Sequence, residues 1–254
     1  MSLSDPPDLS DDRAPVVPSR GRVRVALLAV AAAACLAIAV AAGAAARADL
    51  TRKPTTAQRA TAAARAVADR WRDWSAGHIF PATLSYSTSL LTTETASRVG
   101  VAPGASCSGA VVPILARLAA SDHCQAGLRA TYLDQLEGVV YTIGVLAFPN
   151  SRDAGAFAAR LQARQAGPTS LRPLALPTTA SSRFSPAAEQ AATASHDGPF
   201  VVLTVAGYAD GQPAGTGQQA RSSIFAPAAQ LAGEVIGPLT RPVTVNCGSR
   251  AWSC

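Results

Sequence analysis

The feature that most limits how this chain can fold is an uncharged stretch of 22 residues over 25–46, VALLAVAAAACLAIAVAAGAAA. As an α-helix that rises about 1.5 Å per residue, it would be roughly 33 Å long. The hydrocarbon core of a bilayer is about 30 Å thick. The sequence therefore predicts a transmembrane helix over 25–46, and this helix contacts the lipid bilayer. It separates a short tail, residues 1–24, from a much longer C-terminal part.

Two kinds of cleaved segment are alternatives to a retained helix. Arg20–Arg24 contains three arginines that would form a basic n-region, and Ala46–Ala48 is a small-x-small cleavage site before Asp49. The apolar run exceeds the h-region of about 7–15 residues that signal peptides use, which favours retention. A lipoprotein signal ending at Cys35 is not favoured, because the residues after it stay apolar.

The location of the long C-terminal part follows from general rules of insertion. Long segments translocate largely regardless of their charge, and four of the five cysteines lie beyond residue 47, which favours an oxidising compartment. We expect a single-pass protein of the plasma membrane, with a cytoplasmic N-terminus and an extracellular C-terminal domain.

The charge pattern narrows the class of partner. The net charge is +6 and all of the excess lies beyond the predicted helix, with a basic cluster over 47–72. Such a cluster could contact anionic head groups or wall polymers, although a solvated stalk is the simpler interpretation. A translocated domain with 5% aromatic residues is not expected to bind nucleic acid. The tail at 1–24 lacks an apolar period and is expected to be disordered.

The residues after the membrane helix predict a helical stalk over 47–77. Pro54 suits the first turn of a helix, with Thr51 as a cap just upstream, and Gly77 suits its end. Trp71 and Trp74 share one face of this helix, so we expect them to anchor the stalk onto the domain.

The domain over 78–240 alternates between strand and helix patterns. We expect strands at 83–86, 127–134, 138–148 and 200–208 and an edge piece at 171–176. We expect helices at 93–99, 110–120, 150–165, 187–197 and 223–236. This order predicts an α+β fold, with a mostly antiparallel sheet and helices on one face. The strand at 138–148 is apolar on both faces and should be central.

The candidate catalytic motifs are incomplete. Ser106 lies in GASCSG, which resembles a nucleophile elbow, but G-x-S-x-G would require glycine where Ser108 stands. Asp134, Glu137 and Asp210 lie in strand-end turns, where paired carboxylates could work, although turns attract aspartate in any protein. The sequence therefore predicts no catalytic residue and no enzyme.

Metal and cofactor sites are not predicted either. His78, His123 and His196 are far apart, and Asp122-His123-Cys124 alone is a weak metal motif. The Gly-rich loop at 211–217 matches neither nucleotide-binding fingerprint.

The four cysteines beyond the membrane helix are Cys107, Cys124, Cys247 and Cys254. Four cysteines allow three pairings, and we favour the sequence neighbours, Cys107 with Cys124 and Cys247 with Cys254. The second pair would staple a C-terminal tail over 241–254. A link from Cys107 to either C-terminal cysteine, which would join that tail to the domain, is the alternative.

Several segments resemble a group of uncharacterised single-pass membrane proteins of high-GC Gram-positive bacteria. They are IFPA at 79–82, RVGVAP at 98–103 with Cys107, LRATY at 128–132 and VAGYADG at 205–211. The resemblance implies a cell-envelope setting and supplies no activity or site residues.

Two functions are consistent with these observations. The first is an extracytoplasmic binding or structural module that contacts an envelope protein or polymer, for example as an accessory part of a secretion system. The second is a membrane-tethered hydrolase that acts on cell-wall peptide or glycan. Convergence of carboxylates in a cleft would favour the second.

Overall fold

A computed structural model describes residues 20–88, 90–163, 171–213 and 222–247 of the chain. It divides into two compact units, Met1–Pro54 and Thr55–Cys254. The first unit contains one long helix, α1 (Arg20–Thr51). The part of α1 from Arg24 to Ala48 is long and apolar enough to cross a membrane, and none of it is buried against the chain. A helix that is apolar all round needs an apolar environment, which this unit itself does not provide.

The second unit is α+β and begins with short helices. Thr55 caps α2 (Thr56–Ala68) in a capping box with Gln58, so Thr55 rather than Thr51 is the cap. Trp71 and Trp74 pack against the core of the unit, as expected of an anchor. The remaining elements before the sheet are α3 (Arg70–Asp73) and α4 (Ala76–Ile79).

Six antiparallel strands form one sheet in the order β1-β2-β3-β4-β6-β5. The strands are β1 (Thr83–Ser87), β2 (Thr93–Val101), β3 (Ala126–Leu133), β4 (Val139–Ala147), β5 (Glu189–Asp197) and β6 (Phe200–Tyr208). The apolar strand predicted at 138–148 is the central strand β4, and all nine of its residues are buried.

Two segments expected to be helices are strands. Residues 93–99 lie in β2, and residues 187–197 mostly form β5. Each gains its backbone hydrogen bonds from a neighbouring strand, and these pairings are not visible in local sequence. The expected edge strand at 171–176 contributes only an isolated bridge between Val111 and Leu171.

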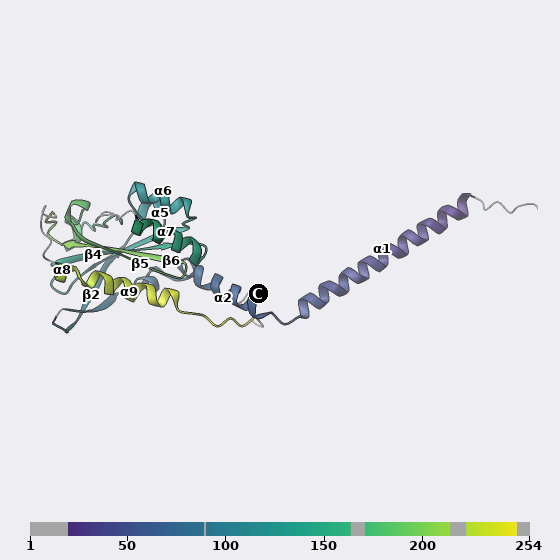
Figure 1. Cartoon of the computed structure of the whole chain (residues 1–254), viewed down its shortest axis with the longest axis horizontal. Helices are drawn as coiled ribbons and strands as arrows, with labels where there is room; N and C mark the ends of the chain where they lie inside the picture. Colours follow the sequence, from purple (N-terminus) through teal and green to yellow (C-terminus); the bar gives the residue numbers. More distant parts are fainter. Residues whose placement is uncertain (1–19, 89, 164–170, 214–221, 248–254) are drawn as a thin grey trace, which may run out of the picture. The chain divides into compact units, whose positions relative to one another are not determined.

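Helices cover both faces of the sheet, and the expectation of helices on one face is wrong (Figure 1). One core contains α9 (Pro227–Thr240), and the other contains α5 (Cys107–Ala110), α6 (Pro113–Ser121) and α7 (Ser151–Ala163). The reason lies in β4 and β6, whose side chains are apolar on both sides and need cover on both. The unit also contains η1 (Ala180–Arg183), η2 (Pro186–Ala188) and α8 (Ser222–Phe225).

Helix α9 contacts both edge strands, β1 and β5, as well as β4 and β6. The sheet therefore curls around this helix. The two ends of the sheet differ in what they carry. At one end, called the α2 end here, β4 ends at Ala147, and Pro149 two residues later lines a cavity together with α2. At the other, called the turn end, lie the β1–β2 and β3–β4 turns and α8.

Candidate functional site

A cavity of about 380 Å³ lies at the turn end of the second unit. We call it the acidic pocket; its polar lining includes Tyr86, Ser87, Glu94, Asp134, Tyr141 and Gln230. Cavities that bind small ligands measure about 300–1,000 Å³. The acidic pocket therefore has room for a small molecule or for one or two side chains of a partner.

The first carboxylate of the pocket is positioned by a strand pair. Tyr86 in β1 lies directly opposite Glu94 in β2, so the two side chains point to the same face of the sheet. The Tyr86 hydroxyl donates a hydrogen bond of 2.9 Å to Glu94 Oε2. This bond holds the Glu94 carboxylate against the pocket wall.

The second carboxylate is positioned by the β3–β4 turn. Asp134 follows β3, and its Oδ1 accepts a 2.8 Å hydrogen bond from the Val139 N–H. The Asp134 N–H donates back to the Val139 carbonyl at 3.1 Å. Asp134 thus closes the turn and lines the pocket together with Val139.

Burial and the nearby carboxylates both shift the pKa values of the two tyrosines in the pocket. Burial raises the pKa of Tyr86 well above its usual value, and the hydrogen bond to Glu94 and the charges of Glu94 and Asp134 raise it further. Burial likewise raises the pKa of Tyr141, with smaller contributions from Tyr86 and the same two carboxylates. Both phenols stay protonated at neutral pH, in a field that is negative.

No cation neutralises this field within the described part of the chain. The ion pairs found there join Arg72 to Asp69, His123 to Asp153 and Arg160 to Asp122. None of them includes Glu94 or Asp134. The acidic pocket therefore presents two carboxylates that an incoming positive charge could approach.

Exposed leucines lie in the two turns that contribute Thr88 and Asp134 to the pocket lining. Leu90 and Leu91 lie in the β1–β2 turn, and Leu136 lies in the β3–β4 turn, with exposed fractions of 83%, 90% and 89%. We call these three residues the leucine rim. Ile224 of α8 lines the pocket itself and is 42% exposed. Adjacent exposed apolar side chains of this kind are typical of contact surfaces.

The structure separates the three carboxylates singled out in the sequence. Asp134 lines the pocket, whereas Glu137 is exposed in the same turn without lining it. Asp210 is exposed after β6, where its Oδ1 accepts a 2.9 Å hydrogen bond from the Gln212 N–H. The partner of Asp134 in the pocket is Glu94, which was not a predicted site residue because residues 93–99 were expected to form a helix. The β-branched Thr93 and Thr95 on either side are the signal for a strand.

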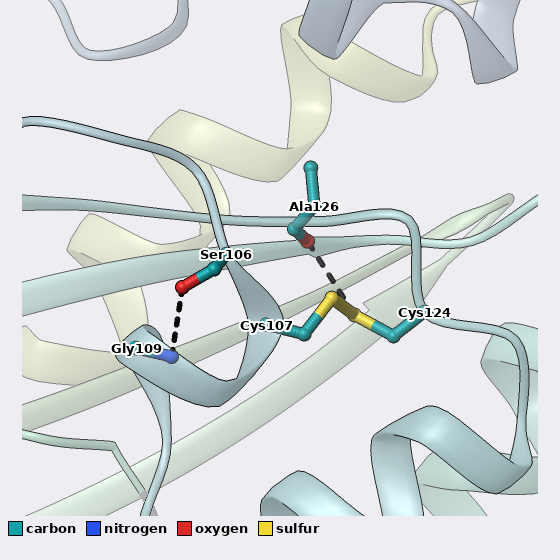
Figure 2. The surroundings of a disulfide bond; sticks show 5 residues. All are labelled: Ser106, Cys107, Gly109, Cys124 and Ala126. Atoms are coloured by element: carbon teal, nitrogen blue, oxygen red, sulfur yellow. Dashed lines mark hydrogen bonds between the residues drawn. A yellow bond between two sulfur atoms is a disulfide. The ribbon is translucent and has the colours of Figure 1, made fainter.

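The Ser106 motif has a structural role (Figure 2). The Ser106 hydroxyl accepts a 3.0 Å hydrogen bond from the Gly109 N–H and thereby caps α5. The next residue, Cys107, is bonded to Cys124, with 6.3 Å between their Cα atoms. This is the local pairing considered in the sequence, and it brackets α5 and α6. Cys247 is disulfide-bonded as well, while Cys254 lies outside the described residues.

The triplet at 122–124 is also structural. Asp122 is buried and pairs with the Arg160 guanidinium, and His123 Nδ1 lies 3.5 Å from Asp153 Oδ2. Among the described residues, no group of three or more His, Cys, Asp or Glu side chains could hold a metal ion. Most of the Gly-rich loop at 211–217 lies outside the described residues.

A second cavity, of about 520 Å³, lies at the α2 end. Its lining combines small and apolar residues with Thr61, Asn150, Ser151 and Thr240, and Arg65 is its one charged residue. A ligand site needs a few polar groups that fix orientation, and the acidic pocket supplies more of them.

No protein-family model, curated protein or solved structure matches the chain. The function is therefore inferred from what the acidic pocket can do chemically. Two carboxylates, two phenols and an amide can bind a positively charged group. None of the three histidines lines the pocket, so a serine–histidine pair for acyl transfer does not occur there.

Proposed function

We propose that the protein is a membrane-tethered, extracytoplasmic binding module of the cell envelope, and that the acidic pocket is its binding site. The observation that supports this most directly is a cavity of ligand size that combines two carboxylates without a cation partner in the described residues and a rim of exposed leucines. Its partner is an envelope protein or polymer.

The position of the pocket in the second unit supports the same proposal. The chain enters this unit at Thr55, beside the α2 end, whereas the acidic pocket lies at the turn end. Within this unit, no residue of α2 lines the acidic pocket. An accessory role in a membrane complex such as a secretion system is one form of this function.

Site-specific photo-crosslinking in intact envelopes tests the binding function. A photoreactive residue at Leu136 should capture an envelope component, because this position lies beside the pocket and is 89% exposed. Ile114 in α6 is the matched control, since it is an apolar residue 46% exposed away from the pocket. Equal capture from both positions, or none from Leu136, would contradict the proposal.

A separate experiment tests whether the apolar helix is retained as a membrane anchor. Sequencing of the protein in the membrane fraction should find no N-terminus at Asp49, because the helix at 24–48 is retained in this proposal. If most of the protein begins at Asp49, the segment is a signal peptide and the module is released.

A hydrolase acting on cell-wall peptide or glycan is the second candidate, because Glu94 and Asp134 share one cavity. Glycosidases require one of two such groups to act as an acid. Here both carboxylates are held by hydrogen bonds from the chain itself, from the Tyr86 hydroxyl to Glu94 and from the Val139 N–H to Asp134, which suits a fixed binding surface. Binding is therefore the function we propose first. Turnover of muropeptides or glycan strands that Glu94→Gln and Asp134→Asn abolish would establish the hydrolase instead.

A further inference from the structure

We infer that the acidic pocket receives a cationic side chain of a partner peptide, an ammonium or guanidinium group at the end of an aliphatic stem. This inference rests on the proposed binding function and specifies the ligand. It assigns a role to Glu94, Asp134, Tyr86 and Tyr141 together, and to the leucine rim around them.

The charge of the ligand follows from the two carboxylates. Glu94 and Asp134 both raise the pKa of the two tyrosines, so their fields overlap inside the pocket. Neither forms an ion pair within the described part of the chain. A positive charge placed between them would interact favourably with both, and partial burial reduces screening by solvent.

The organic nature of the cation follows from the other walls. The rings of Tyr86 and Tyr141 lie with their centroids 6.5 Å apart, and both residues line the pocket. Aromatic faces attract ammonium and guanidinium groups, and Val139, Ile224 and Pro227 provide apolar contacts for a stem. A calcium ion would instead require six to eight oxygen ligands and gain nothing from these walls.

The peptide context follows from the pocket's border. The leucine rim supplies apolar surface on both turns beside the pocket, where residues flanking the cationic side chain would pack. Addition of a strand to β1 is disfavoured at Ser87, whose N–H and carbonyl are occupied by the Gln230 side chain at 2.8 and 2.9 Å. The ligand is therefore expected to insert a side chain rather than pair its backbone with this edge.

Calorimetric titration of the full chain in detergent tests the inference. The probes are acetyl-Leu-Lys-Leu-amide, its arginine counterpart and the neutral norleucine counterpart. The two cationic peptides should bind at least about tenfold more tightly than the norleucine peptide, and their affinity should fall as salt is raised.

Isosteric variants assign the effect to the pocket. Glu94→Gln and Asp134→Asn should each weaken the cationic peptides about tenfold. Both keep an oxygen that accepts from Tyr86 or Val139, so the fold is retained. Glu137→Gln is the matched control, because this carboxylate is exposed in the same turn but does not line the pocket. It should leave the affinity unchanged.

Each other outcome has a definite meaning. If all three peptides bind equally, or if none binds while Leu136 still captures an envelope component, the cation inference is wrong and the binding function stands. If calcium alone binds and displaces the peptides in a Glu94-dependent way, the pocket is a metal site and the inference is overturned. If no peptide binds and Leu136 captures nothing, both proposals fail.

Discussion

The two ends of the sheet in the second unit differ in whether their polar and apolar side chains contact other parts of the chain or stay exposed. At the α2 end, buried Arg70 donates hydrogen bonds to the carbonyls of Pro238 and Leu239 at 3.1 and 2.8 Å. Its guanidinium carbon lies 4.9 Å from the Trp74 ring centroid, and Trp74 stacks on His78. The polar side chain of Arg70 and the rings of Trp74 and His78 are thus used within the chain at this end.

At the turn end the corresponding groups are left available. The leucine rim is exposed, and Glu94 and Asp134 lack a cation partner in the described residues. Left-handed φ angles, which cost energy for residues with a Cβ, do not distinguish the ends, because Leu91 and Glu137 have 61° and 53° at the turn end and His123 has 62° at the α2 end. The exposed leucines add little to the stability of the isolated fold, whereas Asp134 also closes its turn through hydrogen bonds. The contrast supports our proposal that the turn end is the binding end of this unit.

The largest expected effect compares one apolar truncation at each end. Phe148 is fully buried beside Phe157 at the α2 end, so Phe148→Ala should lower the free energy of unfolding by about 4 kcal/mol. Leu136→Ala should change it by less than about 0.5 kcal/mol. Urea denaturation of the two variants measures both. Comparable losses would remove the distinction between the ends.

The Cys107–Cys124 disulfide should give the next largest effect. Cys124 lies two residues before β3, whose first residue pairs with the last residue of β4 at the α2 end. The bond closes a loop with a sequence separation of 17, for which chain entropy predicts about 3 kcal/mol. The double variant Cys107→Ser, Cys124→Ser should lose about that much in denaturant titrations. Cys35→Ser is the control, because Cys35 is free and exposed on α1.

Sequence patterns predicted the elements whose apolar period is unambiguous. The central position of β4 followed from its apolar residues on both faces, and Asn150 caps α7 by accepting from the Asp153 N–H at 3.0 Å. The same apolar pattern also requires helices on both faces of the sheet. The prediction of helices on one face did not take this requirement into account. The segments β2 and β5 contain alanine and glutamate, which favour helices locally, and pairing with neighbouring strands overrides that preference.

The acidic pocket could not be assembled from the sequence, because its residues converge only through the topology. Tyr86 and Glu94 meet by antiparallel pairing of β1 with β2, Asp134 arrives from the β3–β4 turn, and Gln230 comes from α9. Asp134 alone was identified beforehand, from its place at a strand end. Once residues 93–99 were expected to be helical, Glu94 had no predicted relation to Tyr86.

A smaller effect is expected from the paired arginine Arg70 at the α2 end. Arg70→Ala should cost about 2 kcal/mol, because it removes two buried hydrogen bonds and leaves the α9 carbonyls unsatisfied. Arg72→Ala should cost less than about 1 kcal/mol, since its contact with Asp69 is largely exposed. Thermal melts of both variants provide the comparison. An equal loss would mean that Arg70 contributes only surface charge.

The last comparison concerns the pH dependence that Glu189, a buried carboxylate at the turn end, contributes to stability. Glu189 begins β5 opposite Gly207 and is 2% exposed, and none of the residues that the structure describes forms a hydrogen bond with either carboxylate oxygen. Burial raises the pKa of Glu189 to about 8, from an ordinary value of 4.5. The folded state therefore prefers the protonated form, whereas the unfolded chain ionises at lower pH.

Because the pKa of Glu189 is higher in the folded state than in the unfolded chain, the free energy of unfolding falls as the pH rises. Below about pH 4.5 both states are protonated and Glu189 costs nothing, and stability is lost as the pH rises from there through the folded pKa near 8. Between pH 5 and 8, a rise in pKa from 4.5 to about 8 corresponds to a loss of about 3–4 kcal/mol from this group. Glu189→Gln should remove that part of the slope in denaturation curves at pH 5 and 8, while Glu137→Gln should keep the wild-type slope. If Glu189→Gln leaves the slope unchanged, the burial of this carboxylate does not destabilise the turn end, and the cost of that end lies in its exposed leucines and left-handed turn residues alone.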